Sequence, residues 1–144
     1  MFSTRLFAKR DKPSAPQYFA VAGGAALAGA LLCVAALANG SRSTKDGVFT
    51  TAQAERGKQI YEQSCKNCHQ ADFYSERLVR WENKSVDELF QAVSTSMPAD
   101  NVGSLASSEY VDVLAYVFSI TGAPSGSGEL TTDNMATVKI AAPK

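Results

Sequence analysis

The stretch Cys65-Lys66-Asn67-Cys68-His69 places two thiols and an imidazole close together in the chain. Two cysteines separated by two residues, with a histidine directly after the second, form the attachment pattern of a c-type haem. A haem carries two vinyl groups, and Cys65 and Cys68 lie about one helical turn apart, so each can form a thioether from the same side. His69 then supplies the imidazole that binds the iron as proximal ligand. The motif therefore predicts one covalently bound haem c.

Three other uses of the cysteine pair fit the sequence less well. A structural zinc site normally has four Cys or His ligands, whereas His69 is the only histidine and the third cysteine, Cys33, lies in an apolar run. A thioredoxin-type Cys-x-x-Cys belongs next to a βαβ pattern, and the sequence shows none. A disulfide between Cys65 and Cys68 would close a very small loop and gain little stability from it.

Length and charge limit the domain count and the possible partners. With 144 residues, the chain has room for one compact domain and little more. The formal net charge is zero, but residues 1–17 carry four cations and one anion, whereas residues 39–144 carry ten cations and thirteen anions. Because nucleic-acid binding needs a basic face, this distribution argues against a nucleic-acid partner.

Residues 18–38 form an uncharged apolar run directly after the basic residues 1–17. The run is long enough to cross a bilayer as a helix, and the positive-inside rule then leaves residues 1–17 in the cytoplasm. Ala36-Leu37-Ala38 has the small-x-small form of a signal-peptidase site, so a cleaved signal sequence is the alternative. We favour an uncleaved single-pass anchor, because the run is longer than a signal-peptide core. Both alternatives place the haem motif outside the cytoplasm, and the favoured anchor places it on the periplasmic face of a bacterial inner membrane.

The spacing of apolar residues predicts three helices after a polar, flexible linker at residues 39–50. The first covers residues 51–65 with Thr51 as its cap. The second begins with a capping box of Ser85 and Glu88 and ends near residue 95. The third runs over residues 107–121 and stops at Gly122. Residues 123–144 are rich in Pro, Ser, Gly and Thr, and we expect an extended tail that lies on its own domain or on a partner, with a short strand at residues 138–142.

Three groups of residues recur at the spacing of a known family: Gly57-x-x-x-Tyr61-x-x-x-Cys65-x-x-Cys68-His69, then Met97-Pro98, then Leu114-Ala115-Tyr116-Val117. Over about residues 54–122 they resemble a class I cytochrome c domain. The resemblance implies an all-α fold with three to four helices around one haem. It also implies that the first and last helices cross at Gly57 against an aromatic residue, either Tyr110 or Tyr116. Gln70 departs from the glycine that often follows the haem histidine in this family.

Met97 is the candidate sixth ligand of the haem iron. A thioether is a soft ligand for haem iron, and Met97 follows the haem histidine in the order of the family. Methionine is more often a core residue, but Pro98 stiffens the loop here. Met135 is the rival candidate, but it lies in the expected tail. Arg80 and Trp81 are candidates to bind the haem propionates, and simple solvated or packing roles are equal alternatives for both.

Electron transfer is the function that the resemblance implies. The runs around Trp81, Met97 and Tyr110 are similar to those of cytochrome c domains that accept electrons from periplasmic quinoprotein dehydrogenases. The expected partners are such a dehydrogenase, a respiratory or photosynthetic complex, or a terminal oxidase. A fixed haem c subunit of a larger membrane complex is the first alternative, and a haem-based sensor is the second. We expect no enzymatic activity and no small-molecule substrate, because the sequence has no second histidine, no nucleophile with a base and no phosphate-binding loop.

Overall fold

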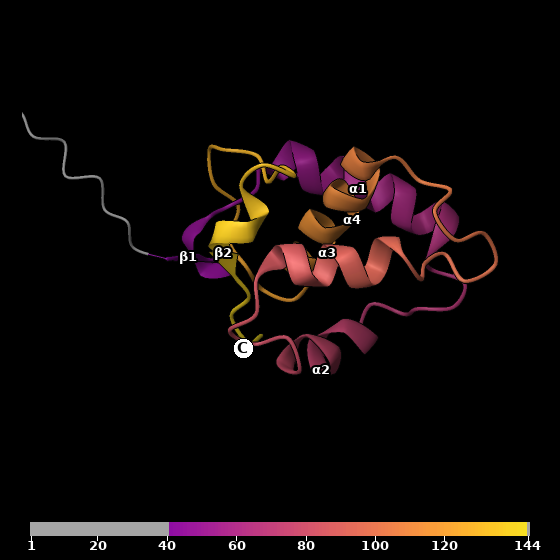
Figure 1. Cartoon of the computed structure of the whole chain (residues 1–144), viewed down its shortest axis with the longest axis horizontal. Helices are drawn as coiled ribbons and strands as arrows, with labels where there is room; N and C mark the ends of the chain where they lie inside the picture. The colour runs from indigo at the N-terminus through magenta and orange to yellow at the C-terminus, as the bar shows by residue number, and fades with distance from the viewer. Residues whose placement is uncertain (1–40, 144) are drawn as a thin grey trace, which may run out of the picture. The chain divides into compact units, whose positions relative to one another are not determined.

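The computed structural model describes residues 41–143, which are mostly helical (Figure 1). The helices are α1 (Thr51–Ser64), α2 (Phe73–Val79), α3 (Val86–Ser94) and α4 (Ser107–Ile120). Two short strands, β1 (Arg42–Ser43) and β2 (Val138–Lys139), pair in parallel next to the 3-10 helices η1 (Thr44–Asp46) and η2 (Met135–Thr137). The prediction of a mostly helical fold is confirmed at this level.

The cytoplasmic tail predicted at residues 1–17 and the anchor or signal segment predicted at residues 18–38 lie outside the described residues. Between residues 41 and 143, no helix is both long and apolar enough to span a membrane.

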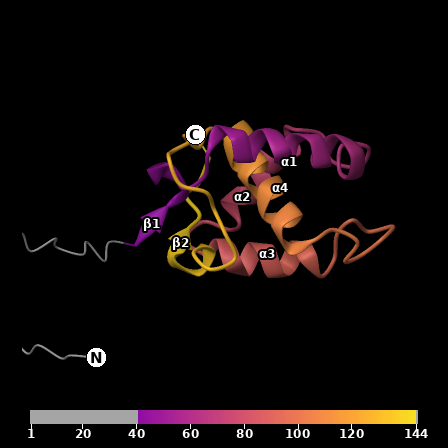
Figure 2. The same ribbon diagram turned by 90° about the horizontal axis from the view of Figure 1, so that it is seen from above.

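Helices α1 and α4 cross in direct backbone contact at Gly57 (Figures 1 and 2). A Cβ atom added to Gly57 would lie 1.8 Å from the main-chain oxygen of Asp112, so only glycine permits this approach. Next to the crossing, the ring centroids of Tyr61 and Tyr116 are 5.0 Å apart. Of the two aromatic residues proposed for this place, Tyr116 therefore packs on α1, while Tyr110 packs edge-on against Phe90 of α3.

The helix ends follow local sequence signals with one correction. The predicted capping box is present, since the Glu88 amide donates to Ser85 Oγ and the Ser85 amide donates to Glu88 Oε2. At the end of α4, Gly122 adopts φ 90° and the Ala123 amide reaches the Phe118 carbonyl at 3.0 Å, as in a Schellman motif. The cap of α1 is Thr50 and not Thr51, because Thr50 has the extended backbone of a cap and its Oγ1 accepts from Gln53 N.

Helix α2 lies in residues 70–84, where no helix was predicted. It has seven residues, and only Leu78 among them is buried. A helix this short presents too few apolar positions for the 3.6-residue period to stand out. The segment nevertheless covers one side of the unit, with Tyr74 and Trp81 packed against the core.

Within the described residues, the segments before α1 and after α4 belong to the same compact unit as residues 51–122, which were expected to form the domain by themselves. The expected flexible linker at residues 39–50 contains Phe49, whose side chain is 0% exposed. The expected extended tail folds back across the helices and buries four apolar side chains in their core: Leu130, Met135, Val138 and Ile140. The linker is therefore packed and not free, whereas the tail lies on its own domain, which is one of the two positions expected for it. The depth of burial in both segments was not predicted, because a few apolar residues among polar ones show no periodic pattern. The strand expected at residues 138–142 is present as β2.

Main-chain and side-chain hydrogen bonds fasten the tail. The side chain of the buried Gln53 makes two hydrogen bonds to the main chain of Leu130. Its Nε2 donates to the Leu130 carbonyl at 2.8 Å, and its Oε1 accepts from the Leu130 main-chain N–H at 2.9 Å. Further along, the Ile140 amide donates to the Lys84 carbonyl, and the Asn83 amide donates to the Ile140 carbonyl. These bonds join the tail to the start of α1 and to the residues before α3.

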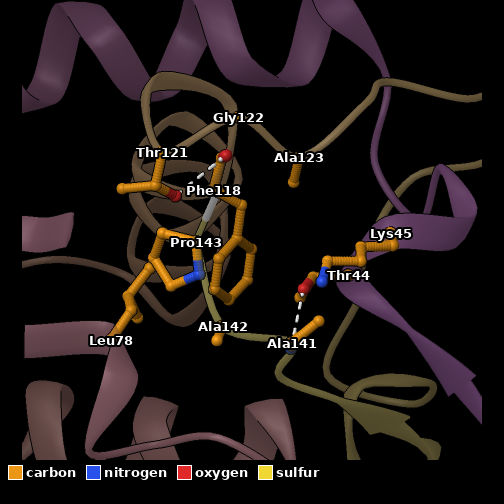
Figure 3. A pocket seen from close by; sticks show the side chains of 10 residues that line it. All are labelled: Thr44, Lys45, Leu78, Phe118, Thr121, Gly122, Ala123, Ala141, Ala142 and Pro143. Atoms are coloured by element: carbon orange, nitrogen blue, oxygen red, sulfur yellow. Dashed lines mark hydrogen bonds between the residues drawn. The ribbon is translucent and has the colours of Figure 1, made fainter.

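The last described residues close over the end of α4 (Figure 3). Thr44 Oγ1 accepts a hydrogen bond of 3.0 Å from the Ala141 amide, and Pro143 lies beside Phe118. The cavity enclosed there has a volume of about 10 Å³, which is about the space that one water molecule needs. This end of the unit is therefore closely packed.

Replacing Gly57 by alanine should destabilise the domain by about 3 kcal/mol, because neither backbone can yield to the new methyl group. The better helix propensity of alanine offsets only about 1 kcal/mol of this loss. Chemical denaturation followed by circular dichroism measures the change. Gly128→Ala is the matched control and should be nearly neutral, since nothing lies within 4 Å of a Cβ at that position. Equal stability of the two variants would contradict the tight crossing.

Replacing Gln53 by leucine should cost about 2–3 kcal/mol of unfolding free energy, because it leaves the buried N–H and C=O of Leu130 without partners. The loosened tail should also become the first site of limited proteolysis. Gln59→Leu, at an exposed position of the same helix, is the control and should leave both the stability and the cleavage pattern nearly unchanged.

Candidate functional site

The predicted haem-attachment residues lie on one turn that continues from α1. Cys65 is the C-terminal cap of the helix, and its amide donates to the Tyr61 carbonyl. The amides of Cys68 and His69 both donate to the Cys65 carbonyl, at 3.1 and 2.9 Å. These bonds bring the two cysteines and the histidine together on a single turn. Both cysteines are free thiols; Cys65 is half-buried and Cys68 is exposed.

Aromatic side chains surround His69. The His69 ring lies 4.7 Å from the Phe73 ring and 6.1 Å from the Tyr74 ring, measured between centroids. The Tyr61 hydroxyl donates a hydrogen bond to the His69 carbonyl. The position and the main chain of the histidine are thus fixed from α1 and α2.

The imidazole of His69 has a nitrogen without a protein partner. Its Nδ1 is buried and makes no hydrogen bond within residues 41–143. Buried polar atoms normally have a partner, and a histidine that binds a metal usually donates its second ring N–H to a carbonyl or carboxylate. The orphaned Nδ1 therefore does not identify the ligand atom. What fits a haem c is the donor set itself, two free thiols and an imidazole on one turn.

Burial also affects the ionisable groups of this turn. Burial raises the pKa of the Cys65 thiol. It also raises the pKa of the nearby Tyr74 hydroxyl, and the neighbouring Cys65 and Tyr61 raise that pKa further. A thiol with a raised pKa has less thiolate at neutral pH and is a weaker nucleophile. Cys65 is packed against the hydrophobic core, which accounts for the raised pKa of its thiol.

Met97 is held between α3 and α4. Its amide donates to the Val93 carbonyl at 2.8 Å, and its carbonyl accepts from the Tyr110 hydroxyl at 2.6 Å. The loop that contains Met97 and the turn at the end of α1 lie at the same end of the helical unit in both views (Figures 1 and 2). The rival Met135 is only 2% exposed and is a core residue of the folded tail.

Arg80 and Trp81 are not brought to this end of the unit. They precede α3, whereas Met97 follows it, and the nine residues of that helix span about 13 Å. Arg80 is exposed, and Trp81 is half-buried with the Lys84 ammonium 4.7 Å from its ring centroid. Their role at the propionates stays a prediction.

A second hollow lies away from the cysteine turn. It has a volume of about 390 Å³ and is lined by residues of α1, the start of α4 and residues 129–132. Arg56 bridges Asp112 and Glu129 there, at 2.9 and 3.0 Å. Within the part of the chain that the structure describes, no group of three or more His, Cys, Asp or Glu side chains is arranged to hold a metal ion.

The tyrosine contacts to the main chain were missed by the sequence analysis. Tyr61 and Tyr110 were noted as packing residues, but their hydroxyls bond to the carbonyls of His69 and Met97. The available signal was that both tyrosines stand on the apolar faces of their helices, where a buried phenol needs a hydrogen-bond partner.

Comparisons with protein-family models, with curated proteins and with solved structures find no match to this chain. The resemblance to class I cytochrome c domains therefore depends on the sequence motifs alone.

The two thiols should differ in reactivity in protein purified without haem. Cys68 should be alkylated by iodoacetamide several-fold faster than Cys65 at pH 7.5, because Cys68 is exposed whereas burial raises the pKa of Cys65. The reaction at Cys65 should accelerate at more alkaline pH, as its thiolate forms. Peptide mass spectrometry measures the extent of alkylation at each cysteine separately. Equal rates after unfolding in urea are the control, and equal rates in the native protein would contradict the described burial.

Proposed function

We propose that this chain is a mono-haem c-type cytochrome that transfers electrons. The observation that carries the proposal is the turn Cys65–His69, which presents two free thiols and an imidazole from the end of α1. Its likeness to a class I cytochrome c domain in motif order, and the α1–α4 crossing at Gly57, support the same proposal.

Each site residue has one task in this proposal. Cys65 and Cys68 hold the haem by thioethers, and His69 and Met97 are its axial ligands. When bound, the haem supplies a one-electron iron centre. With His69 and Met97 both binding the iron, no coordination position would be left open for a substrate. The chain then acts as an electron carrier and has no enzymatic activity of its own.

The proposed setting is the periplasmic face of a bacterial inner membrane, with residues 18–38 as a single-pass anchor. Covalent haem attachment takes place outside the cytoplasm, which agrees with the orientation that the basic residues 1–17 favour. The proposed partners are redox proteins, with a quinoprotein dehydrogenase first among them, or a respiratory or photosynthetic complex or a terminal oxidase.

A fixed haem subunit of a larger complex is the alternative. The tail was one argument for it, as a free binding element, but Leu130, Met135 and Ile140 of the tail are buried in its own unit. The remaining argument is the run of small residues in the predicted anchor, which would allow close helix packing. Size analysis of the detergent-extracted protein separates the two, because a carrier runs as a small species.

Haem attachment and ligation can be tested together in full-length protein produced with a haem-attachment system. The wild type should retain haem after denaturation, whereas Cys65→Ala and Cys68→Ala together should lose it. The ferric protein should show the weak long-wavelength band of methionine-to-iron charge transfer, and Met97→Ala should abolish that band and allow carbon monoxide to bind the reduced form.

Met135→Leu is the matched control for Met97→Ala. It replaces a buried methionine by a residue of similar volume and should keep the charge-transfer band. A wild type that never acquires covalent haem would end the proposal. A wild type with a high-spin haem that takes up carbon monoxide at once would favour a haem-based sensor instead.

A further inference from the structure

Each proposed axial ligand has its main-chain carbonyl bonded by a tyrosine hydroxyl from the crossed helix pair. Tyr61 of α1 donates to the His69 carbonyl, and Tyr110 of α4 donates to the Met97 carbonyl. His69 also has a second main-chain bond, to Cys65, and through it belongs to a rigid turn. Met97 has the corresponding bond, from its amide to the Val93 carbonyl at the end of α3, so the Tyr110 hydroxyl is the contact that joins its main chain to α4.

The loop after Met97 gives it little support. Residues 99–104 are all exposed, and the main-chain bonds within the loop are local, from Asn101 to Pro98 and from Ser104 to Asn101. A methionine side chain has three rotatable bonds and adapts easily to its surroundings. The main-chain position from which the Met97 thioether extends is therefore set by two bonds, one to Val93 of α3 and one from Tyr110 of α4.

Tyr110 is itself held rigidly. It is 4% exposed, and its ring packs edge-on against Phe90, with 6.2 Å between the centroids and 90° between the planes. A phenol fixed in this way cannot follow the loop if the loop moves. It binds the Met97 carbonyl at one position or releases it.

We propose that Tyr110 is a positioning residue that holds Met97 in place as the sixth ligand and slows its replacement by other ligands. This inference rests on the proposed function. The hydroxyl of Tyr110 contributes here through the main chain of Met97 and touches no reacting atom. Since α4 is in backbone contact with α1 at Gly57, the same helix pair that holds the His69 turn also fixes the opposite ligand.

Displacement of Met97 by imidazole in the full-length, haem-loaded ferric protein tests this inference. Tyr110→Phe should keep the charge-transfer band without imidazole, but the imidazole concentration at half-displacement should fall about fivefold, as expected for one lost net hydrogen bond. Thr121→Val is the matched control, since it removes a hydroxyl-to-carbonyl bond from the same helix, between Thr121 Oγ1 and the Val117 carbonyl at 2.8 Å. Its midpoint should equal that of the wild type.

An unchanged midpoint in Tyr110→Phe, or an equal fall in Thr121→Val, would overturn the inference. Absence of haem or of the methionine band from the wild type would instead be a failure of the proposed function, so the two failures are distinguishable. If Tyr110→Phe does not fold by circular dichroism, proton NMR of the reduced wild type decides. A slowly exchanging Tyr110 hydroxyl proton near the Met97 and Pro98 protons supports the inference, and its absence in a resolved spectrum overturns it.

Discussion

The backbone contact between Gly57 and Asp112 is the constraint on which the rest of the unit depends. Because no side chain separates α1 from α4 there, the tyrosines that follow on each helix are brought within ring contact. Arg56, next to Gly57, forms a two-pronged ion pair with the largely buried Asp112 at the same crossing. Close packing and charge pairing thus act at one point, and both parts of the candidate site extend from it.

The polar segments before α1 and after α4 complete a core that the helices alone would leave open. Phe49, Leu130 and Ile140 are among its most buried side chains, although each comes from a segment rich in small and polar residues. Gly126 and Gly47 let the two segments meet, since a Cβ on Gly126 would lie 2.0 Å from the Gly47 carbonyl oxygen. A small helical unit gains buried apolar area in this way without a further helix.

Features encoded within about four residues could be predicted from the sequence. The Ser85–Glu88 box, the stop at Gly122 and the turn of Cys65–His69 all depend on neighbouring residues. Features that join distant parts of the chain could not. Gln53 and Leu130 are 77 residues apart, and no local sequence pattern around either residue indicates that they pair. Met97 could be selected as a ligand from its family order, whereas the hydroxyl that fixes it becomes visible only when α4 packs beside α3.

The two halves of the candidate site therefore differ in what they require of the fold. The cysteines and His69 need only the last turn of α1, because the bonds that gather them are local. Met97 needs α3 and α4 in their final arrangement, because one of its main-chain bonds goes to each helix. Under the proposed function, covalent haem attachment would need only the local turn, whereas ligation by Met97 would need the complete tertiary structure. Disturbing the helix packing would then weaken the Met97 ligand before it affected the thioethers.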